Sequence, residues 1–173
     1  ISKVVDADGR PLVVYHYTNL TRNNKSMPFW EFNSYSHFGT KGQAESVNNS
    51  QHKKTIDVLH VTPQKMELTK TYPVYLNIRN PKRVEDVPWD WDETHNQWWS
   101  MQIYLAVKEG YDGIVYLNEY EDPKHPADSW IAFYPEQVKS ADENIGSYDP
   151  SVRYIRYRDY EVFSDGERIP INV

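Results

Sequence analysis

The chain has 173 residues, of which 39% are hydrophobic and 25% charged, values typical of one globular domain with a real hydrophobic core. The formal net charge is −6 and no basic patch stands out, which disfavours nonspecific binding to nucleic acids. The chain contains no cysteine, which excludes disulfides, thiolate zinc sites and a cysteine nucleophile.

No signal peptide is recognisable, and no apolar run approaches the roughly 18 residues that a membrane-spanning helix needs. We therefore expect no membrane contact and a place of action in the cytoplasm of a host or target cell. Because the chain begins with Ile1 rather than Met, we expect residues 1–173 to be a single domain of a larger protein. The 14 tyrosines and 6 tryptophans combine apolar area with polar groups, a property that suits a binding cleft.

Residues 1–18 are predicted to form a β-hairpin. Two apolar segments, Lys3–Val5 and Leu12–Tyr15, flank an Asp-Gly pair at residues 8–9, which readily adopts the positive φ values of a tight turn. The second strand ends at His16, where polar residues begin. A histidine in this place is either a hydrogen-bonded core residue or part of a small-molecule site.

Residues 19–36 are predicted to form a long loop, and loops of this length in compact domains are often functional. A helix is predicted to begin next, because Thr40 and Gln43 form a capping box and Gly39 lets the backbone turn inward. The helix should run to about Asn49. Its first N–H groups can hold an anion, although the same pattern is that of an ordinary capped helix.

The second half of the chain is predicted to contain short strands and one further helix. The helix covers residues 94–109, with Trp98, Met101 and Leu105 on one face, and Gly110 ends it. This pattern favours the α+β class with mostly antiparallel sheet. The other predicted elements are strands at residues 55–62, 74–78, 114–117, 129–133 and 153–163, an acidic loop at 118–128, a closing segment at 135–138 and a terminal hairpin turn at 165–166.

Common catalytic motifs do not occur in this sequence. The six histidines include no H-x-x-x-H pair and no H-E-x-x-H, so no metal site is predicted. There is no G-x-S-x-G elbow of a serine hydrolase, and no G-x-G-x-x-G or Walker sequence. A carboxylate pair for glycoside chemistry could come from the acidic loop, whose members are ordinarily solvated: Glu119, Glu121, Asp122 and Asp128.

Four stretches, taken in order, resemble the ADP-ribosyltransferase fold of the His-Tyr-Glu branch, which includes diphtheria-toxin-like and PARP-like enzymes. The nearest likeness is to domains of large phage and mobile-element polyvalent proteins and of bacterial toxins. The stretches are Val14–Thr18, His37–Lys41 with Ala44, Tyr72–Pro81, and Gly110–Val115, which continues to Asp128–Ala141.

The resemblance covers about residues 11–150, with residues 151–173 as a β extension, and implies a split antiparallel two-sheet fold with few helices. It implies an enzyme that uses NAD as co-substrate, binds it between the first and third motifs, and passes ADP-ribose to a macromolecule. The expected role is mono-ADP-ribosylation by a toxin, an effector or a phage-borne modifier, with a cognate immunity protein among its partners. The acidic net charge favours a protein acceptor over RNA.

The resemblance also implies roles for individual residues of the first two motifs. His16 would hold the NAD ribose, the backbone of Tyr17 would pair with the nicotinamide amide, and Thr18 matches a small hydroxyl residue. An aromatic side chain of the second motif would stack on the nicotinamide. The expected NAD-binding residues are therefore His16, Tyr17, Thr18, Tyr35, His37, Phe38 and Gly39.

The third motif departs from the family pattern, because its glutamate falls on Ser129. That glutamate aligns the ribose and stabilises the positive charge that develops as nicotinamide leaves. Asp128 could replace it with a shift of one residue, Glu121 could do so from the acidic loop, and Ser129 could align the ribose without neutralising charge. The expected catalytic residues are His16, Asp128 and Ser129.

Two alternatives to this hypothesis stay open. The chain could be an RNA-processing enzyme, a ribonuclease or a 2′-phosphotransferase-like relative, that uses His16 and His37 as acid and base. It could also be an inactive module that keeps the fold in order to bind NAD or a partner, as the missing third-motif glutamate would allow.

Overall fold

The computed structural model describes residues 1–19, 32–47, 49, 69–88, 93–142, 160–162 and 168–170. Helical residues 41–47 follow the second strand, and a longer helix, α2, lies between the fourth and fifth strands. None of the helices in these ranges is long and apolar enough to cross a membrane. The labelled elements are β1 Val14–Asn19, β2 Ser36–Phe38, β3 Thr69–Leu76, β4 Pro81–Arg83, α2 Glu93–Lys108, β5 Gly113–Asn118, β6 Ala127–Ala132, the 3-10 helix η2 Pro135–Gln137, β7 Val138–Ser140, β8 Tyr160–Val162 and β9 Arg168–Pro170.

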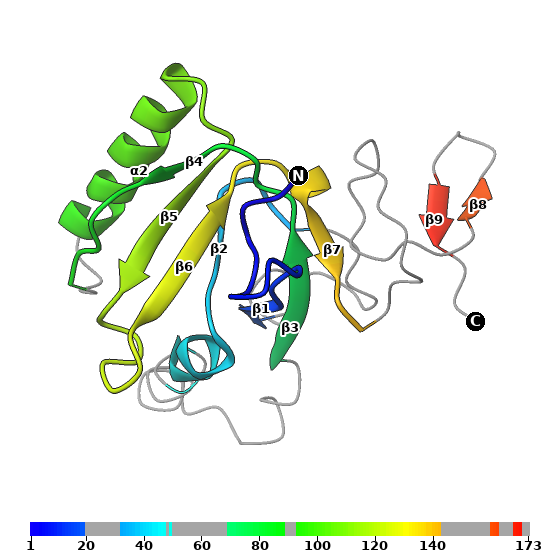
Figure 1. Ribbon diagram of the computed structural model, residues 1–173, viewed down its shortest axis with the longest axis horizontal. Helices are drawn as coiled ribbons and strands as arrows, with labels where there is room; N and C mark the ends of the chain where they lie inside the picture. The colour runs from blue at the N-terminus through cyan, green and yellow to red at the C-terminus, as the bar shows by residue number, and fades with distance from the viewer. Residues whose placement is uncertain are drawn as a thin grey trace.

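The strands form a three-stranded sheet, β1-β3-β7, a four-stranded sheet, β2-β6-β5-β4, and the pair β8-β9 (Figure 1). All pairs are antiparallel except β4 and β5, which are parallel. This agrees with the predicted α+β class and its mostly antiparallel sheet, with β4 and β5 as the exception. The physical reason is that α2 connects β4 to β5, and a helical crossover is the connection that parallel neighbours require.

Two backbone hydrogen bonds link the two larger sheets. The N–H of Tyr15 donates to the carbonyl of Gly39 at 2.8 Å, and the N–H of Gly39 donates to the carbonyl of Tyr15 at 3.0 Å. Tyr15 belongs to β1 and Gly39 directly follows β2, so this bridge places the first two motifs side by side.

The four-stranded sheet is buried on both faces, as alternation along β6 shows. Trp130 and Ala132 belong to the hydrophobic cluster shared with the three-stranded sheet, which also contains Val14 and Val74. The intervening Ile131 belongs to the second cluster, which packs under α2. Because successive side chains of a strand point to opposite faces, the functional side chains of this sheet are also divided between its two faces.

The helix predictions are largely confirmed. The capping box is present, because the Thr40 N–H donates to Gln43 Oε1 at 2.8 Å and the Gln43 N–H donates to Thr40 Oγ1 at 3.2 Å. The second helix ends as predicted at Gly110, which has a φ of +84°. The predicted buried face of this helix is wrong at Met101, which is 54% exposed, since the side chains buried there are Trp99 and Ala106.

The strand predictions have mixed outcomes. The strands predicted at 74–78, 114–117 and 129–133 correspond to β3, β5 and β6. The predicted N-terminal hairpin is present in a short form, with an antiparallel bridge between Val5 and Pro11 and a φ of +78° at Gly9 in its turn. Pairing of β8 with β9 agrees with a terminal hairpin. The strand predicted at 55–62 and most of the predicted 19–36 loop lie outside the described residues.

The first prediction concerns Gly113, the first residue of β5. A Cβ added there would lie 2.6 Å from Ile78 Cγ2 and 3.0 Å from the backbone oxygen of Ile131. We expect Gly113→Ala to lower the free energy of unfolding by about 1–3 kcal/mol through overpacking, as measured by urea denaturation. The same glycine substitution should cost less stability when it is made in an Ile78→Ala background than when it is made in the wild type, because the smaller side chain leaves room for the added Cβ. A Gly113→Ala protein as stable as the wild type would contradict the packing described here.

Candidate active site

One cavity of about 510 Å³ contains most of the predicted NAD-binding residues. Its walls come from both larger sheets, the first turns of the helix after β2, and α2. Its volume lies in the range of ordinary small-molecule sites. The lining residues are Tyr15, His16, Tyr17, His37, Phe38, Gly39, Ala44, Val47, His95, Asn96, Trp99, Ser100, Ile103, Tyr116, Glu121 and Ser129.

His16 lines this cavity, and its orientation is fixed by one hydrogen bond and two rings. Its Nδ1 lies 2.5 Å from the carbonyl oxygen of His37. Its ring packs against the rings of Phe32 and Phe38, with distances between ring centroids of 5.1 and 5.3 Å. A carbonyl can only accept, so Nδ1 carries the proton and Nε2 is the unprotonated nitrogen. Burial lowers the pKa of His16, so the ring is neutral and Nε2 can accept a hydrogen bond.

His37 belongs to an aromatic wall of the same cavity. Its ring meets Trp99 edge-on at 5.2 Å, and Trp99 lies 4.6 Å from the ring of Tyr116. Burial, together with repulsion from His16 and His95, lowers the pKa of His37 to about 3. The His37 side chain is therefore uncharged at neutral pH, and the wall offers flat surfaces for a planar ring.

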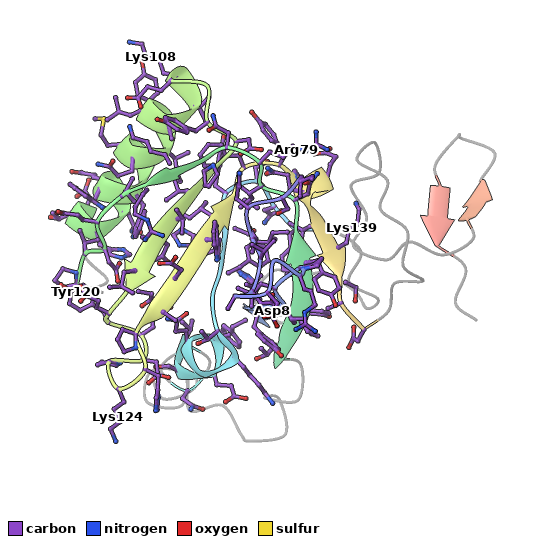
Figure 2. The ribbon with its side chains drawn as sticks, in the orientation of Figure 1. Asp8, Arg79, Lys108, Tyr120, Lys124 and Lys139 are labelled. Atoms are coloured by element: carbon purple, nitrogen blue, oxygen red, sulfur yellow. The ribbon has the colours of Figure 1, made fainter. Side chains whose placement is uncertain are left out.

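Among the described residues that line this cavity, Glu121 is the only acidic one. Burial raises the pKa of Glu121 to about 7, a hydrogen bond from Asn118 lowers it, and the charge of Asp86 raises it. The Asn118 amide nitrogen donates to Glu121 Oε2 at 2.5 Å. A carboxylate that titrates near neutrality inside a cavity is a recognised mark of a functional site. Figure 2 shows the neighbouring Tyr120, in the β5–β6 connection, at the end of α2 opposite Lys108.

Two neighbouring residues of β6, Asp128 and Ser129, have different surroundings. Ser129 is 1% exposed and lines the cavity, where its hydroxyl donates to Gln43 Oε1 at 2.9 Å. Asp128 is not part of the lining; it makes a double ion pair with Arg83, at 3.0 and 2.7 Å. Alternation along the strand explains the difference, because consecutive side chains point to opposite faces.

The remaining predicted residues are divided between the cavity and other places. Tyr17, Phe38 and Gly39 line the cavity, although the Phe38 side chain is 1% exposed and mainly supports His16. Tyr35 is not in the lining; it packs against Phe133 beyond the other end of β2. The side chain of Thr18 lies outside the described residues.

A family model described as ADP-ribosyltransferase in polyvalent proteins matches residues 6–148. The chain belongs to this family. No curated protein and no solved structure matches it. The assignment of this ADP-ribosyltransferase domain to the His-Tyr-Glu branch stays a prediction.

Sequence reasoning did not find the contribution of α2 to the cavity of the ADP-ribosyltransferase domain. The lining residues of α2 are His95, Asn96, Trp99, Ser100 and Ile103, which recur at intervals of three and four and so share one helical face. That spacing was visible in the sequence, but its mixed polarity hid it from a search for an apolar stripe. Tyr116 was likewise recognised only as a strand residue.

The described residues contain no group of three or more His, Asp or Glu side chains that could hold a metal ion. The ADP-ribosyltransferase domain places the neutral imidazoles of His16 and His37 and one carboxyl group around the cavity. This set can accept hydrogen bonds from hydroxyl groups and can place one negative charge, that of Glu121, beside a bound molecule.

The second prediction follows from the raised pKa of Glu121. The folded state binds the Glu121 proton more tightly than the unfolded chain, so the stability gained at low pH is lost as pH rises from about 4.5 to 7. Glu121→Gln removes this titration. We therefore expect Glu121→Gln to become more stable relative to the wild type, by up to about 3 kcal/mol, between pH 4 and pH 8.

Urea denaturation of both proteins across this pH range measures the difference. Glu136→Gln is a control at a carboxylate outside the cavity lining. A stability difference between Glu121→Gln and the wild type that does not change with pH would show that Glu121 titrates as it does in water.

Proposed function

We propose that this ADP-ribosyltransferase domain is a mono-ADP-ribosyltransferase that transfers the ADP-ribosyl group of NAD to a macromolecular acceptor. One observation carries the proposal: the carboxyl group of Glu121 and the unprotonated Nε2 of His16 belong to the same cavity. One group can place negative charge beside the ribose, and the other can accept a ribose hydroxyl hydrogen bond.

NAD is compatible with the donors and acceptors of this cavity. The backbone groups of Tyr17 face the same edge of β1 as those of Tyr15, which pair with Gly39, because alternate residues direct their N–H and C=O groups to the same side. That edge suits pairing with the nicotinamide amide. The wall of His37, Trp99 and Tyr116 offers a surface for the nicotinamide ring.

In the proposed reaction, the bond between nicotinamide and ribose C1′ breaks and its electron pair leaves with nicotinamide. The acceptor nucleophile then forms a bond to C1′ and loses a proton. Ionised Glu121 would stabilise the positive charge on the ribose between these events, and a buried carboxylate is more effective at this than an exposed one. His16 would hold the ribose in place.

Glu121 is a better candidate than Asp128 for the missing third-motif glutamate. The amide nitrogen of Asn118 contacts both Ser129 Oγ, at 3.0 Å, and Glu121 Oε2, at 2.5 Å, so these two oxygens are at most about 5.5 Å apart. Glu121 thus brings its carboxylate close to the position that the family glutamate would occupy. The charge of Asp128 is already balanced by Arg83.

The electrostatics disfavour the alternative of an RNA-cleaving acid and base pair. Such a pair needs one histidine to be protonated near neutral pH, whereas burial lowers the pKa of both His16 and His37. An inactive module would keep the cavity without turnover. The buried carboxyl group of Glu121 favours an active enzyme over that alternative. Burying a carboxyl group costs free energy, and NAD binding alone does not require one.

We propose a protein acceptor in preference to RNA, since a net charge of −6 repels a phosphate backbone. The family description points to polyvalent proteins. A toxin, effector or phage-borne modifier that acts in the cytoplasm of a host or target cell fits that setting, and a cognate immunity protein would be a natural partner.

The third prediction tests this function with labelled NAD and a host lysate. The wild type should release nicotinamide and transfer label to a macromolecule, and treating the products with protease or ribonuclease identifies the acceptor class. His16→Ala and Glu121→Gln should each lower nicotinamide release by about 10²-fold or more, the loss typical of removing one group that stabilises the transition state.

Asp128→Asn serves as the matched control, since it alters a carboxylate outside the cavity lining, and it should keep most of the activity. Activity lost in Asp128→Asn but kept in Glu121→Gln would reverse the assignment of the carboxylate. NAD binding by calorimetry without any turnover would support the inactive module instead, and no binding at all would refute the proposal.

The fourth prediction is the pH dependence of nicotinamide release. Only the ionised form of Glu121 can stabilise positive charge, and its pKa is about 7. The rate should therefore rise with pH through neutrality and level off about one to two pH units higher. A rate that is constant between pH 6 and pH 8 would exclude Glu121 as the required carboxylate.

A further inference from the structure

Three buried polar side chains connect the start of the helix after β2 to the cavity carboxylate. Gln43, Asn118 and Ser129 are each no more than 1% exposed, although they belong to a helix and two different strands. Buried polar groups are costly unless they are hydrogen-bonded, so a continuous chain of such groups requires an explanation.

Each hydrogen bond in this chain has a determined direction. The Ser129 hydroxyl donates to Gln43 Oε1 at 2.9 Å, and the same oxygen of Gln43 accepts from the Thr40 N–H at 2.8 Å. Ser129 Oγ in turn accepts from the Asn118 amide nitrogen at 3.0 Å. The second proton of that nitrogen goes to Glu121 Oε2, and Asn118 Oδ1 accepts from the Glu121 N–H at 3.2 Å.

The packing around this chain allows few other arrangements. Gln43 Nε2 donates to the carbonyl of Ala127 at 3.2 Å, which fixes the orientation of the Gln43 amide. A Cβ added to Gly39 would lie 2.3 Å from Gln43 Oε1 and 2.7 Å from Ser129 Oγ. The backbone of Gly39 therefore closes over the point where Gln43 and Ser129 meet.

We infer that Asn118 is a positioning residue, which holds the Glu121 carboxylate in the cavity and is itself held through Ser129 and Gln43. This inference rests on the proposed function for its catalytic meaning, but its geometry does not. Asn118 binds both the side chain and the backbone of Glu121, so it determines where the carboxylate lies and favours its ionised form.

Among the other titratable groups around Glu121, one opposes its ionisation and two are uncharged. Asp86 repels the ionised carboxylate, and the rings of His37 and Tyr116 are uncharged because burial lowers the pKa of His37 and raises that of Tyr116. His95 and Tyr120 complete the described titratable groups that line the small cavity beside Glu121. The hydrogen bond from Asn118 is the contact that favours the charged form.

The test measures the pKa of Glu121 and the pH profile of nicotinamide release in the same proteins. The Glu121 carboxyl carbon is followed by NMR in protein labelled with ¹³C-glutamate, and Glu121→Gln assigns its signal. In Asn118→Ala the pKa of Glu121 should rise by about one pH unit, the size expected for one lost charge-assisted hydrogen bond.

The pH profile of nicotinamide release should move by the same amount. At pH 7 the rate should fall about fivefold, because the ionised fraction falls from about one half to about one tenth, and it should largely recover at pH 9. Ser129→Ala, which leaves Asn118 in place but removes its support, should give a smaller shift in the same direction. It also serves as the second variant should Asn118→Ala fail to fold, as judged by thermal unfolding.

Asn80→Ala is the matched control, since Asn80 is exposed and its amide donates to the carbonyl of Gly110 away from the cavity. An unchanged pKa of Glu121 in the folded variants, or an activity loss that is equal at every pH, would overturn the inference. If the wild type releases no nicotinamide but the pKa of Glu121 still moves, the positioning role stands and the proposed function fails.

Discussion

The pair of backbone hydrogen bonds between Tyr15 and Gly39 is the constraint on which the rest of the structure depends. It joins the two larger sheets at the place where the first two motifs meet. From this bridge follows the position of His16, whose Nδ1 then reaches the carbonyl of His37. The lack of a side chain at Gly39 is equally necessary, because it leaves the space in which Gln43 and Ser129 make contact. A local backbone pairing thus sets both walls of the cavity.

The electrostatic character of the cavity follows from burial more than from charge pairing. Desolvation is the main cause that lowers the pKa of His16 and of His37, and the main cause that raises the pKa of Glu121. The cavity therefore contains acceptors without fixed positive charge, together with one carboxylate whose ionisation falls within the physiological range. This combination suits the stabilisation of a transient cation better than proton transfer between two histidines, and it is the physical basis for preferring ADP-ribosyl transfer.

Local signals were predictable from the sequence where a single residue type carries a backbone requirement. The capping box of Thr40 and Gln43 and the helix end at Gly110 are of this kind, and both are present. The first motif was readable only in part: His16 follows an apolar run as predicted, but the strand does not end there, because β1 continues to Asn19. The parallel pairing of β4 with β5 and the exposure of Met101 were not readable, since they depend on which surface α2 covers. Tertiary packing decides such features and periodicity does not.

The carboxylate of the cavity is the feature that sequence comparison predicted least well. The motif comparison placed the family glutamate at Ser129 and favoured Asp128 over Glu121 as its substitute, because such a comparison follows positions along the chain. The structure places the Glu121 carboxylate, from the preceding connection, near Ser129 through a nitrogen that both share. A carboxylate can therefore lie near Ser129 in space while its residue is eight positions away in the sequence. A carboxylate supplied by a connection needs more support than one on a strand, and the buried hydrogen bonds of Asn118 have the geometry to give that support.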